Sequence, residues 1–396
     1  MELPIVECVG CGACQQICPR KCITLDRDSK GFLRPTVNAE SCVSCGLCRE
    51  VCPALNVPNS RPVVGSFAAF HKDKSILRNS SSGGIFHSLA SMVLGNGGVV
   101  FGAAFDQEWK VRHAYVESKE DLHRLMGSKY VQSQIGDSYR KAKGFLVSGR
   151  EVLFTGTPCQ IAGLKAYLRR EYDNLTTLDF ICHGVPSPNV WQRYLSEKSK
   201  EASAVLGSEA RIRSVSFRDK SDSWKRYSLS LGFAKSESRT DDKVFRVSAF
   251  HRKDPYMRAF LNDLILRPSC HSCKFKNHNS NSDITVGDFW RCRSAYPKFY
   301  NPMGVSIAVC YTSKGLNCMN SNDLSLMPLP VEKIVKSNQT IIRSSEESPQ
   351  SALFWKRYGE GKSLNTIMDE VSPYRQLLTE RFKEWLGNVI YKLRTI

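Results

Sequence analysis

The sequence contains no long uninterrupted apolar run that suits a membrane span, although one stretch lacks charge altogether. Residues 79–105 contain no Lys, Arg, Asp or Glu, yet they include His87, Asn96, several serines and six glycines. So many polar and glycine positions make a poor lipid-facing helix. We therefore predict a serine-capped buried helix, a glycine turn and a buried strand in this stretch.

Several local signatures are also absent. Met1-Glu2-Leu3-Pro4 has neither a basic start nor an apolar core, so no signal peptide is expected and the expected location is cytoplasmic. No strand–GxGxxG–helix unit is present, which excludes a Rossmann dinucleotide site. The C-x3-C-x2-C spacing of radical-SAM proteins does not occur either.

Acidic residues are scarce compared with basic ones, 38 against 56, and the formal net charge is +18. Residues 1–60 carry six side chains of each sign, so the whole excess lies after them. Such a surplus suits nucleic acid, an acidic redox partner, an anionic substrate or a membrane surface. Because no nucleic-acid motif is present, we expect a redox partner protein and a small-molecule substrate, and we rank membrane-surface contact below them.

Cysteine is abundant: the chain has 16. In an intracellular chain, tight C-x2-C spacing indicates metal binding rather than disulfides. Two runs share the spacing C-x2-C-x2-C-x3-C-P and lie 34 residues apart. They are Cys8, Cys11, Cys14, Cys18 and Pro19, and then Cys42, Cys45, Cys48, Cys52 and Pro53.

This duplicated run is typical of proteins that hold two [4Fe–4S] clusters, in which the fourth cysteine of each run crosses to the other cluster. We therefore assign Cys8, Cys11, Cys14 and Cys52 to one cluster, and Cys42, Cys45, Cys48 and Cys18 to the other. A pair of zinc knuckles is the alternative, but zinc does not explain two complete runs with trailing prolines. Cys22 has no place in this scheme and is expected to pack.

Strand and helix signals alternate after a Pro-, Asn- and Ser-rich linker at 56–62, which predicts an α/β body with some antiparallel hairpins. Cys159 and Cys182 each follow a predicted buried strand, at 152–154 and 176–181, and each precedes a predicted helix. Cys270 and Cys273 form a further C-x2-C. These four thiols are enough for a third cluster; a zinc site that includes His183 or His271, or unrelated buried cysteines, are the alternatives.

Three loops have the composition to wrap a phosphate or a ring with backbone N–H groups, although each also suits a helix cap or turn. They are Ser81-Ser82-Gly83-Gly84, Gly127-Ser128-Lys129-Tyr130 and Thr155-Gly156-Thr157-Pro158.

The body resembles the beta-subunit family of coenzyme F420-reducing hydrogenases and F420-dependent dehydrogenases, which includes 7-hydroxymethyl chlorophyll a reductase. The resemblance covers residues 62–320 and rests on a set of short motifs. These are Ser82-Gly83-Gly84, Gly127-Ser128-Lys129-Tyr130-Val131-Gln132-Ser133, Gly156-Thr157-Pro158-Cys159-Gln160, Cys182-His183-Gly184-Val185-Pro186-Ser187, Cys270-His271-Ser272-Cys273 and Gly287-Asp288-Phe289. It implies FAD and one [4Fe–4S] cluster in the body, with an N-terminal two-cluster ferredoxin in some members.

The resemblance and the motifs together predict three parts: a two-cluster ferredoxin domain at 1–56, an FAD- and cluster-binding mixed α/β domain at 62–325, and a helical C-terminal extension at 326–396. Cofactor contacts are expected from the three loops and from Gln160, His183 and Gly184. A helix with one apolar face is predicted from Tyr374 to Leu393.

Clusters transfer single electrons, whereas FAD also exchanges a hydride, so FAD is the natural junction between clusters and an organic substrate. The predicted function is an iron–sulfur flavoprotein oxidoreductase that acts on an organic substrate such as a deazaflavin, with a ferredoxin or an oxidoreductase subunit as redox partner. His183 and Lys129 are the candidate proton donors. A non-catalytic electron-relay subunit of a larger complex is the alternative.

Overall fold

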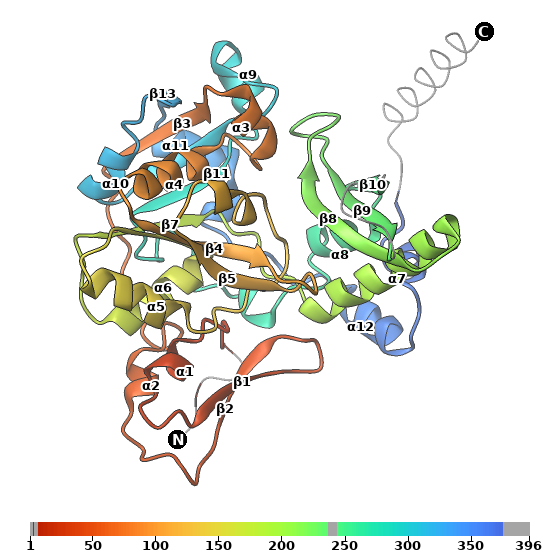
Figure 1. Cartoon of the computed structure of the whole chain (residues 1–396), viewed down its shortest axis with the longest axis horizontal. Coiled ribbons are helices and arrows are strands. Elements are labelled where there is room, and N and C mark those ends of the chain that lie inside the picture. The colour runs from red at the N-terminus through yellow and green to blue at the C-terminus, as the bar shows by residue number, and fades with distance from the viewer. Residues whose placement is uncertain (1–2, 4–6, 237–243, 375–396) are drawn as a thin grey trace.

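The computed structural model describes residue 3 and residues 7–236 and 244–374. They form a small N-terminal module, a large α/β lobe and a second lobe built on a separate sheet (Figure 1). The predicted fold class, a two-cluster module followed by a mixed α/β domain, is confirmed.

The N-terminal module comprises α1 (Ala13–Ile17), the antiparallel strands β1 (Ile23–Arg27) and β2 (Leu33–Val37), and α2 (Leu47–Glu50). Each short helix begins inside a cysteine run, after a glycine in the left-handed region: Gly12 with φ 75° and Gly46 with φ 80°. Glycine alone adopts this backbone without strain, which lets the chain turn back sharply within each run.

The large lobe is organised around one eight-stranded sheet in the order β13-β3-β12-β11-β7-β6-β4-β5. The strands are β3 (Gly65–His71), β4 (Val99–Phe105), β5 (Val111–Val116), β6 (Val152–Thr155), β7 (Leu175–Phe180), β11 (Ile284–Asp288), β12 (Ser306–Cys310) and β13 (Leu324–Pro328). The central strands β4, β6, β7 and β11 are mutually parallel, and the others pair antiparallel.

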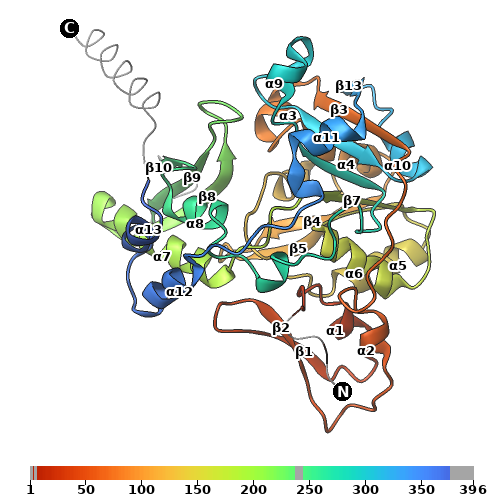
Figure 2. The same ribbon diagram turned by 180° about the vertical axis from the view of Figure 1, so that it is seen from behind.

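Both faces of this sheet are covered by helices, so its central strands are apolar on both sides. Leu153 of β6 packs beneath α4 (Ile85–Gly95), whereas Val152 and Phe154 face α5 (Ser138–Val147) and α6 (Pro158–Leu168). The helices α3 (Lys74–Asn79), α9 (Cys292–Ala295), α10 (Ser313–Cys318) and α11 (Val331–Ser337) complete the lobe. The N-terminal module lies against the side of α5 and α6 (Figures 1 and 2).

The second lobe holds an antiparallel sheet in the order β10-β9-β8, made of β8 (Ala210–Asp219), β9 (Ser228–Lys235) and β10 (Phe245–Phe250). It packs with α7 (Pro188–Leu206), α8 (Pro255–Leu261), α12 (Ser351–Gly359) and α13 (Leu364–Val371) around a core rich in aromatic rings. Trp191, Tyr194 and Tyr256 are buried at its centre.

Residues 326–374 pack into the cores of both lobes. Ile334 of α11 lies in the core of the large lobe, and Phe354, Ile367 and Met368 lie in the core of the second lobe. The predicted domain bounds stay a prediction. The predicted amphipathic helix after Tyr374 falls outside the described residues.

The uncharged stretch at 79–105 forms the predicted helix and strand, α4 and β4, but its helix cap differs from the prediction. The N-cap residue is Gly84 with φ 82°, and no side chain caps the helix. The first N–H groups of α4 are therefore left without a side-chain acceptor.

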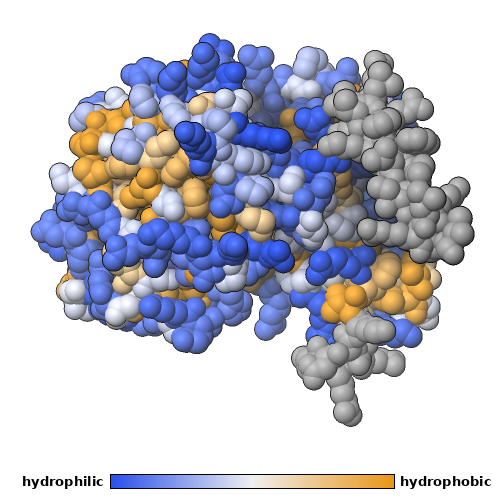
Figure 3. All heavy atoms as spheres, turned by 90° about the horizontal axis from the view of Figure 1, so that it is seen from above, coloured by the Kyte–Doolittle hydropathy of each residue, from blue (hydrophilic) through white to orange (hydrophobic). Residues whose placement is uncertain are grey.

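Among the described residues, none of the helices has the length and apolarity needed to cross a membrane. The face drawn in Figure 3 is mostly hydrophilic, with separate hydrophobic areas.

Candidate functional site

The eight cysteines of the N-terminal module form two groups, each around its own small cavity. Cys8, Cys11, Cys14 and Cys52, here called the proximal thiol group, line one cavity with Gly10 and Gly12. Cys18, Cys42, Cys45 and Cys48, the distal thiol group, line the other with Gly46. The fourth cysteine of each run thus joins the first three of the other run, which is the grouping that the sequence predicts.

The proximal thiols lie close together, with Cys11 buried and Cys8, Cys14 and Cys52 partly buried. Burial, followed by the neighbouring Cys8 and Cys52 thiols, raises the pKa of Cys14 to about 12, and burial raises the pKa of Cys11 well above its usual value. Four thiolates in such a place need a strongly cationic partner. A cubane core of iron ions supplies that charge, so the donor set fits a cluster. Cys22 lies beside the distal group, with its Sγ 3.4 Å from that of Cys18.

The structure also brings together Cys159, Cys182, Cys270 and Cys273, the body thiol group. They come from the start of α6, the loop after β7, the short helix η2 (Pro268–Cys270) and the loop that follows it. Within this group every pair interacts electrostatically. Burial, more than the neighbouring thiols, raises the pKa of Cys159, Cys182 and Cys270 to about 12 each.

One backbone N–H and one hydroxyl contact the body thiols. The N–H of Val185 donates to Cys270 Sγ at 3.4 Å, and Thr157 Oγ1 lies 3.1 Å from Cys159 Sγ. The two histidines of the zinc alternative contact other groups. His183 Nε2 lies 2.8 Å from Asp263 Oδ1, and His271 Nδ1 lies 3.1 Å from the carbonyl oxygen of Ser345. Among the described residues, no group of three or more His, Cys, Asp or Glu side chains has the arrangement that a single metal ion requires.

A cavity of about 470 Å³ opens beside the body thiol group, at the carboxyl ends of the parallel strands. Thr155, Phe180 and Asp288, the last residues of β6, β7 and β11, all line it. This edge of a parallel sheet is where α/β proteins bind their ligands. Cys159 and Cys182 form part of the wall, so the cavity and the thiols are direct neighbours.

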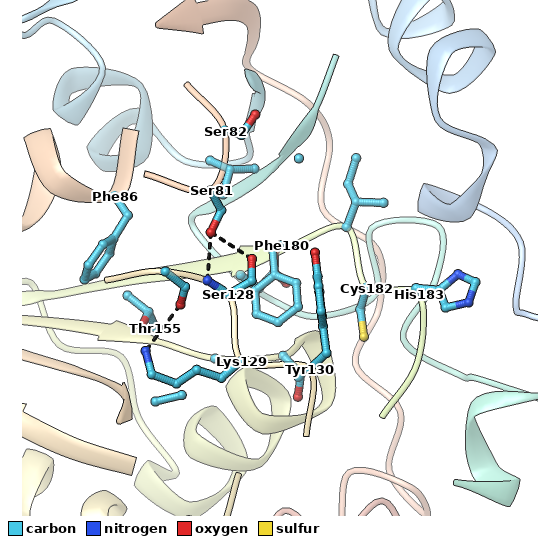
Figure 4. Close-up of a pocket in the computed structure, with 18 of the residues that line it drawn as sticks. Ser81, Ser82, Phe86, Ser128, Lys129, Tyr130, Thr155, Phe180, Cys182 and His183 are labelled. Atoms are coloured by element: carbon cyan, nitrogen blue, oxygen red, sulfur yellow. Dashed lines mark hydrogen bonds between the residues drawn. The ribbon is translucent and has the colours of Figure 1, made fainter. Parts of the chain in front are cut away.

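Most of the predicted cofactor-contact residues line this cavity (Figure 4). They are Ser81, Ser82, Gly84, Gly127, Ser128, Lys129, Tyr130, Thr155, Gly156, Thr157, Gln160, His183 and Gly184. Gly83 and Pro158 do not line it. Gly83 is packed behind its loop, where a Cβ would lie 2.3 Å from the carbonyl oxygen of Ala69, and Pro158 begins α6.

Two of the three predicted loops are tied together at the cavity. Ser81 Oγ accepts hydrogen bonds from the N–H and the hydroxyl of Ser128, at 2.7 and 2.8 Å (Figure 4). The amino ends of α4 and α6 lie beside these loops, and both Gly84 and Thr157, their N-cap residues, line the cavity. The amino end of α4, which no side chain caps, has partial positive charge and free N–H groups that favour anions such as phosphate. The amino end of α6 is closed by the capping box of Thr157 and Gln160 and begins with Pro158, which has no N–H group.

The two candidate proton donors differ in their surroundings. Burial lowers the pKa of Lys129 to about 7, and its Nζ donates to the carbonyl oxygens of Met126, at 2.9 Å, and Gly127, at 3.3 Å. His183 lies on the far side of Cys182 from Lys129, with its ring turned away from that lysine (Figure 4). Its ring packs edge-on against Phe260 at a centroid distance of 5.0 Å.

Sequence reasoning missed two charged groups in the cavity wall. Asp179 of β7 accepts a hydrogen bond from Thr285 Oγ1, and burial raises its pKa to about 7. Arg218 of β8 reaches across from the second lobe to Asp288 at 2.7 Å, between the rings of Tyr227 and Trp290. An aspartate inside an apolar strand was a usable signal for the first, but nothing in the pattern of β8 singles out the second.

Family comparisons match most of the chain before residue 325. The N-terminal part of the family described as coenzyme F420 hydrogenase/dehydrogenase, beta subunit, matches residues 66–138, and the C-terminal part of the same family matches residues 149–325. The description "4Fe-4S dicluster domain" matches residues 7–56.

Among solved structures, 13 chains match. One comes from a study of xenon derivatization of the F420-reducing [NiFe] hydrogenase complex from Methanosarcina barkeri. It is 18% identical in sequence, with a TM-score of 0.47, and the match covers 77% of this chain and 96% of that chain. No curated protein matches in sequence.

Proposed function

Because this chain belongs to the coenzyme F420 hydrogenase/dehydrogenase beta-subunit family and is an iron–sulfur redox protein, we propose that it is a flavin-dependent oxidoreductase. In this proposal the proximal, distal and body thiol groups hold three [4Fe–4S] clusters, and the 470 Å³ cavity holds FAD. A redox partner protein such as a ferredoxin exchanges electrons with the N-terminal module, and an organic substrate, such as a deazaflavin, exchanges a hydride at the cavity.

The four body thiols offer a complete set of thiolate ligands for a third cluster. The histidines of the zinc alternative are held elsewhere, since His183 Nε2 lies 2.8 Å from Asp263 Oδ1 and His271 Nδ1 lies 3.1 Å from the Ser345 carbonyl oxygen. A cubane core takes one thiolate at each of its four irons. The donors from Val185 and Thr157 suit its sulfurs.

The cavity supports FAD by its size and by the groups at its wall. Its volume lies in the usual range of cofactor sites, about 300–1,000 Å³. The amino end of α4 with the Ser81, Ser82 and Ser128 hydroxyls would hold the phosphates, and Tyr130 and Phe180 offer apolar surface for rings. Bound there, FAD supplies the exchange between single electrons and a hydride.

The chain's own residues would orient the reacting groups and handle protons. Lys129 has a pKa of about 7 because of burial, so it can give or take a proton near neutral pH and is the better candidate proton donor. His183 is held beside Asp263 and is better placed to support the loop that carries Cys182. The second lobe closes one side of the cavity through the Arg218–Asp288 pair, which helps to exclude water.

The observation that carries the proposal is the shared wall: Cys159 and Cys182 border the same cavity as the predicted flavin loops. Single-electron carriers and a two-electron cofactor need this closeness to exchange electrons.

The direct test is reconstitution without oxygen, followed by metal, sulfide and flavin analysis. We expect about 12 iron and 12 sulfide per chain, with one FAD. The bound flavin should then be reduced by reduced ferredoxin or by reduced deazaflavin in rapid-mixing measurements. Protein that binds three clusters but no flavin would be an electron relay, and stoichiometric zinc with about eight iron would remove the third cluster.

A further inference from the structure

One arginine is buried between the proximal thiol group and the body thiol group. Arg267 is only 1% exposed, although an isolated guanidinium strongly prefers water. Its position is fixed from the body side: its N–H donates to the Val185 carbonyl oxygen at 2.8 Å, and its own carbonyl oxygen accepts from the N–H of Cys270 at 2.8 Å. The arginine therefore belongs to the same tight segment as the body thiols.

The guanidinium of Arg267 reaches into the N-terminal module. Nε donates to the carbonyl oxygen of Cys8 at 2.7 Å, and Nη2 donates to the carbonyl oxygen of Leu33 at 2.7 Å. Its face packs against the ring of the buried Phe32, 5.5 Å from the centroid. Ser269 Oγ donates to the same Cys8 carbonyl at 3.1 Å, so two side chains of the body hold this one backbone oxygen.

The third nitrogen, Nη1, is buried and has no hydrogen-bond partner. Nη1 has room here because residue 10 is a glycine: a Cβ on Gly10 would lie 3.0 Å from Arg267 Nη1 and 2.6 Å from Gln132 Nε2. The positive φ of Gly10, 68°, also favours glycine. The guanidinium is thus buried with one nitrogen unpaired, and its hydrogen bonds run to backbone carbonyl oxygens rather than to a carboxylate.

Thiols of both groups act on this charge. Burial lowers the pKa of Arg267, as does the nearby Arg34, whereas Cys8, Cys270 and Cys159 each act to raise it. Cys8 belongs to the proximal group, whereas the other two thiols belong to the body group. No acidic side chain is among the largest influences on this pKa.

We propose that Arg267 is a positioning residue for electron transfer: its buried charge is shared by the proximal and body clusters, raises the reduction potentials of both, and holds the two at a fixed separation. The proposal rests on the proposed function, since it requires a cluster in the body. A cation stabilises the form of a cluster that carries one more electron. Because the Arg267 guanidinium adjoins both clusters, it favours the reduction of each cluster and does not make either one the preferred electron donor.

The test is a redox titration of the full reconstituted chain, followed by electron paramagnetic resonance. Arg267→Gln keeps a hydrogen-bond donor but removes the charge. We expect the midpoint potentials of the proximal and body clusters to fall together, while the potential of the distal cluster stays unchanged as an internal control. Arg267→Lys, which keeps the charge, should restore most of both shifts.

Arg34→Gln is the matched control. Arg34 Nη1 also approaches the Cys8 carbonyl oxygen, at 3.5 Å, but its charge is paired with Asp28 at 3.1 Å. Its loss should leave the body cluster unchanged.

A second variant covers the case in which Arg267→Gln does not fold. Gln132 Oε1 accepts from the N–H of Leu33 at 3.1 Å, and Gln132→Glu keeps that acceptor while placing a carboxylate beside Arg267 Nη1. It should lower both potentials with the tether intact. Unchanged potentials in a variant that holds about 12 iron, or a shift at one cluster alone, would overturn the shared charge. An iron content near eight in the unaltered chain would instead contradict the third cluster and the proposed function.

Discussion

The proximal and distal thiol groups each take three cysteines from runs of identical spacing, but their surroundings differ. Cys11 of the proximal group is 7% exposed and packs in the core beneath α5 and α6, together with Tyr139 and Phe154. Cys45 of the distal group is exposed, and the neighbouring Val43 is 59% exposed. Spacing determines what each group can bind, whereas the surrounding protein determines where electrons can enter and leave. We expect the distal group to face the partner protein and the proximal group to serve the body.

The largest effect is expected when one cysteine ligand is removed from each group. Cys11→Ser and Cys45→Ser should each lose about a third of the iron, since serine is a poorer ligand for iron than thiolate. Ferredoxin-driven flavin reduction should fail in both. Rapid mixing with reduced ferredoxin, together with iron analysis, measures the two effects.

Cys270→Ser provides the control from the body. It should also lose about a third of the iron and interrupt electron transfer to the flavin, while both N-terminal clusters remain reducible by ferredoxin. Normal flavin reduction in this variant, with its iron fully retained, would show that Cys270 is not a ligand.

Chelation sharpens the comparison without a mutation. In the oxidised protein, an iron chelator should remove iron from the distal group, where Cys45 is exposed, before the proximal group, where Cys11 is buried, because attack on a cluster requires access to it. Besides the iron of the body cluster, we expect the N-terminal module to release its iron in two phases, each of about four iron ions. Loss of both groups at one rate would mean that their different burial does not control access.

The sequence predicts the N-terminal thiol groups more directly than it predicts the body thiol group. The two N-terminal groups are foreseeable because their ligands repeat at fixed spacing and cross in a known way. The body group joins Cys159 and Cys182, which follow separate parallel strands, with a pair nearly ninety residues further on. A sheet edge brings such residues together, but only the family motifs single out these four among 16 cysteines.

The fold was foreseeable to a similar degree. The strands at 152–155 and 175–180 and the helix at 188–206 follow the predicted pattern, since apolar runs bounded by Gly and Pro are local signals. The second lobe was not predicted. Its core joins Trp191 with Phe354 and Met368, which lie far apart in sequence, and no local pattern records that contact. Arg267 was missed for the same reason.

The packing of the proximal thiol group against the body can be tested at Gly163 of α6. A Cβ at this position would lie 2.9 Å from Cys11 Sγ and 3.0 Å from the hydroxyl of Tyr139. Gly163→Ala should therefore destabilise the fold by about 2 kcal/mol and speed iron loss from the proximal group, because a tightly packed core does not accept the extra methyl group.

Gly144 of α5 is the matched helical control, since a Cβ there meets nothing within 4 Å. Gly144→Ala should be neutral or stabilise by about 0.5–1 kcal/mol through helix propensity. Denaturation of the two variants under anaerobic conditions gives both values. Equal stability of the two would mean that α6 does not press on Cys11.

The smallest expected effect on stability comes from the glycine that precedes the short helix in each cysteine run, a feature that the two runs share. Gly12 and Gly46 occupy equivalent places in the two runs, with φ of 75° and 80°, and a Cβ on either has no contact closer than 3.6 Å. Alanine at either position should cost about 1 kcal/mol of backbone strain, with no steric penalty in addition. Gly12→Ala and Gly46→Ala should thus lower the stability of the holoprotein by similar amounts. A much larger loss for Gly12→Ala would place the difference between the groups in the loop backbone, whereas equal losses place it in the surrounding protein, where Cys11 is covered and Cys45 is not.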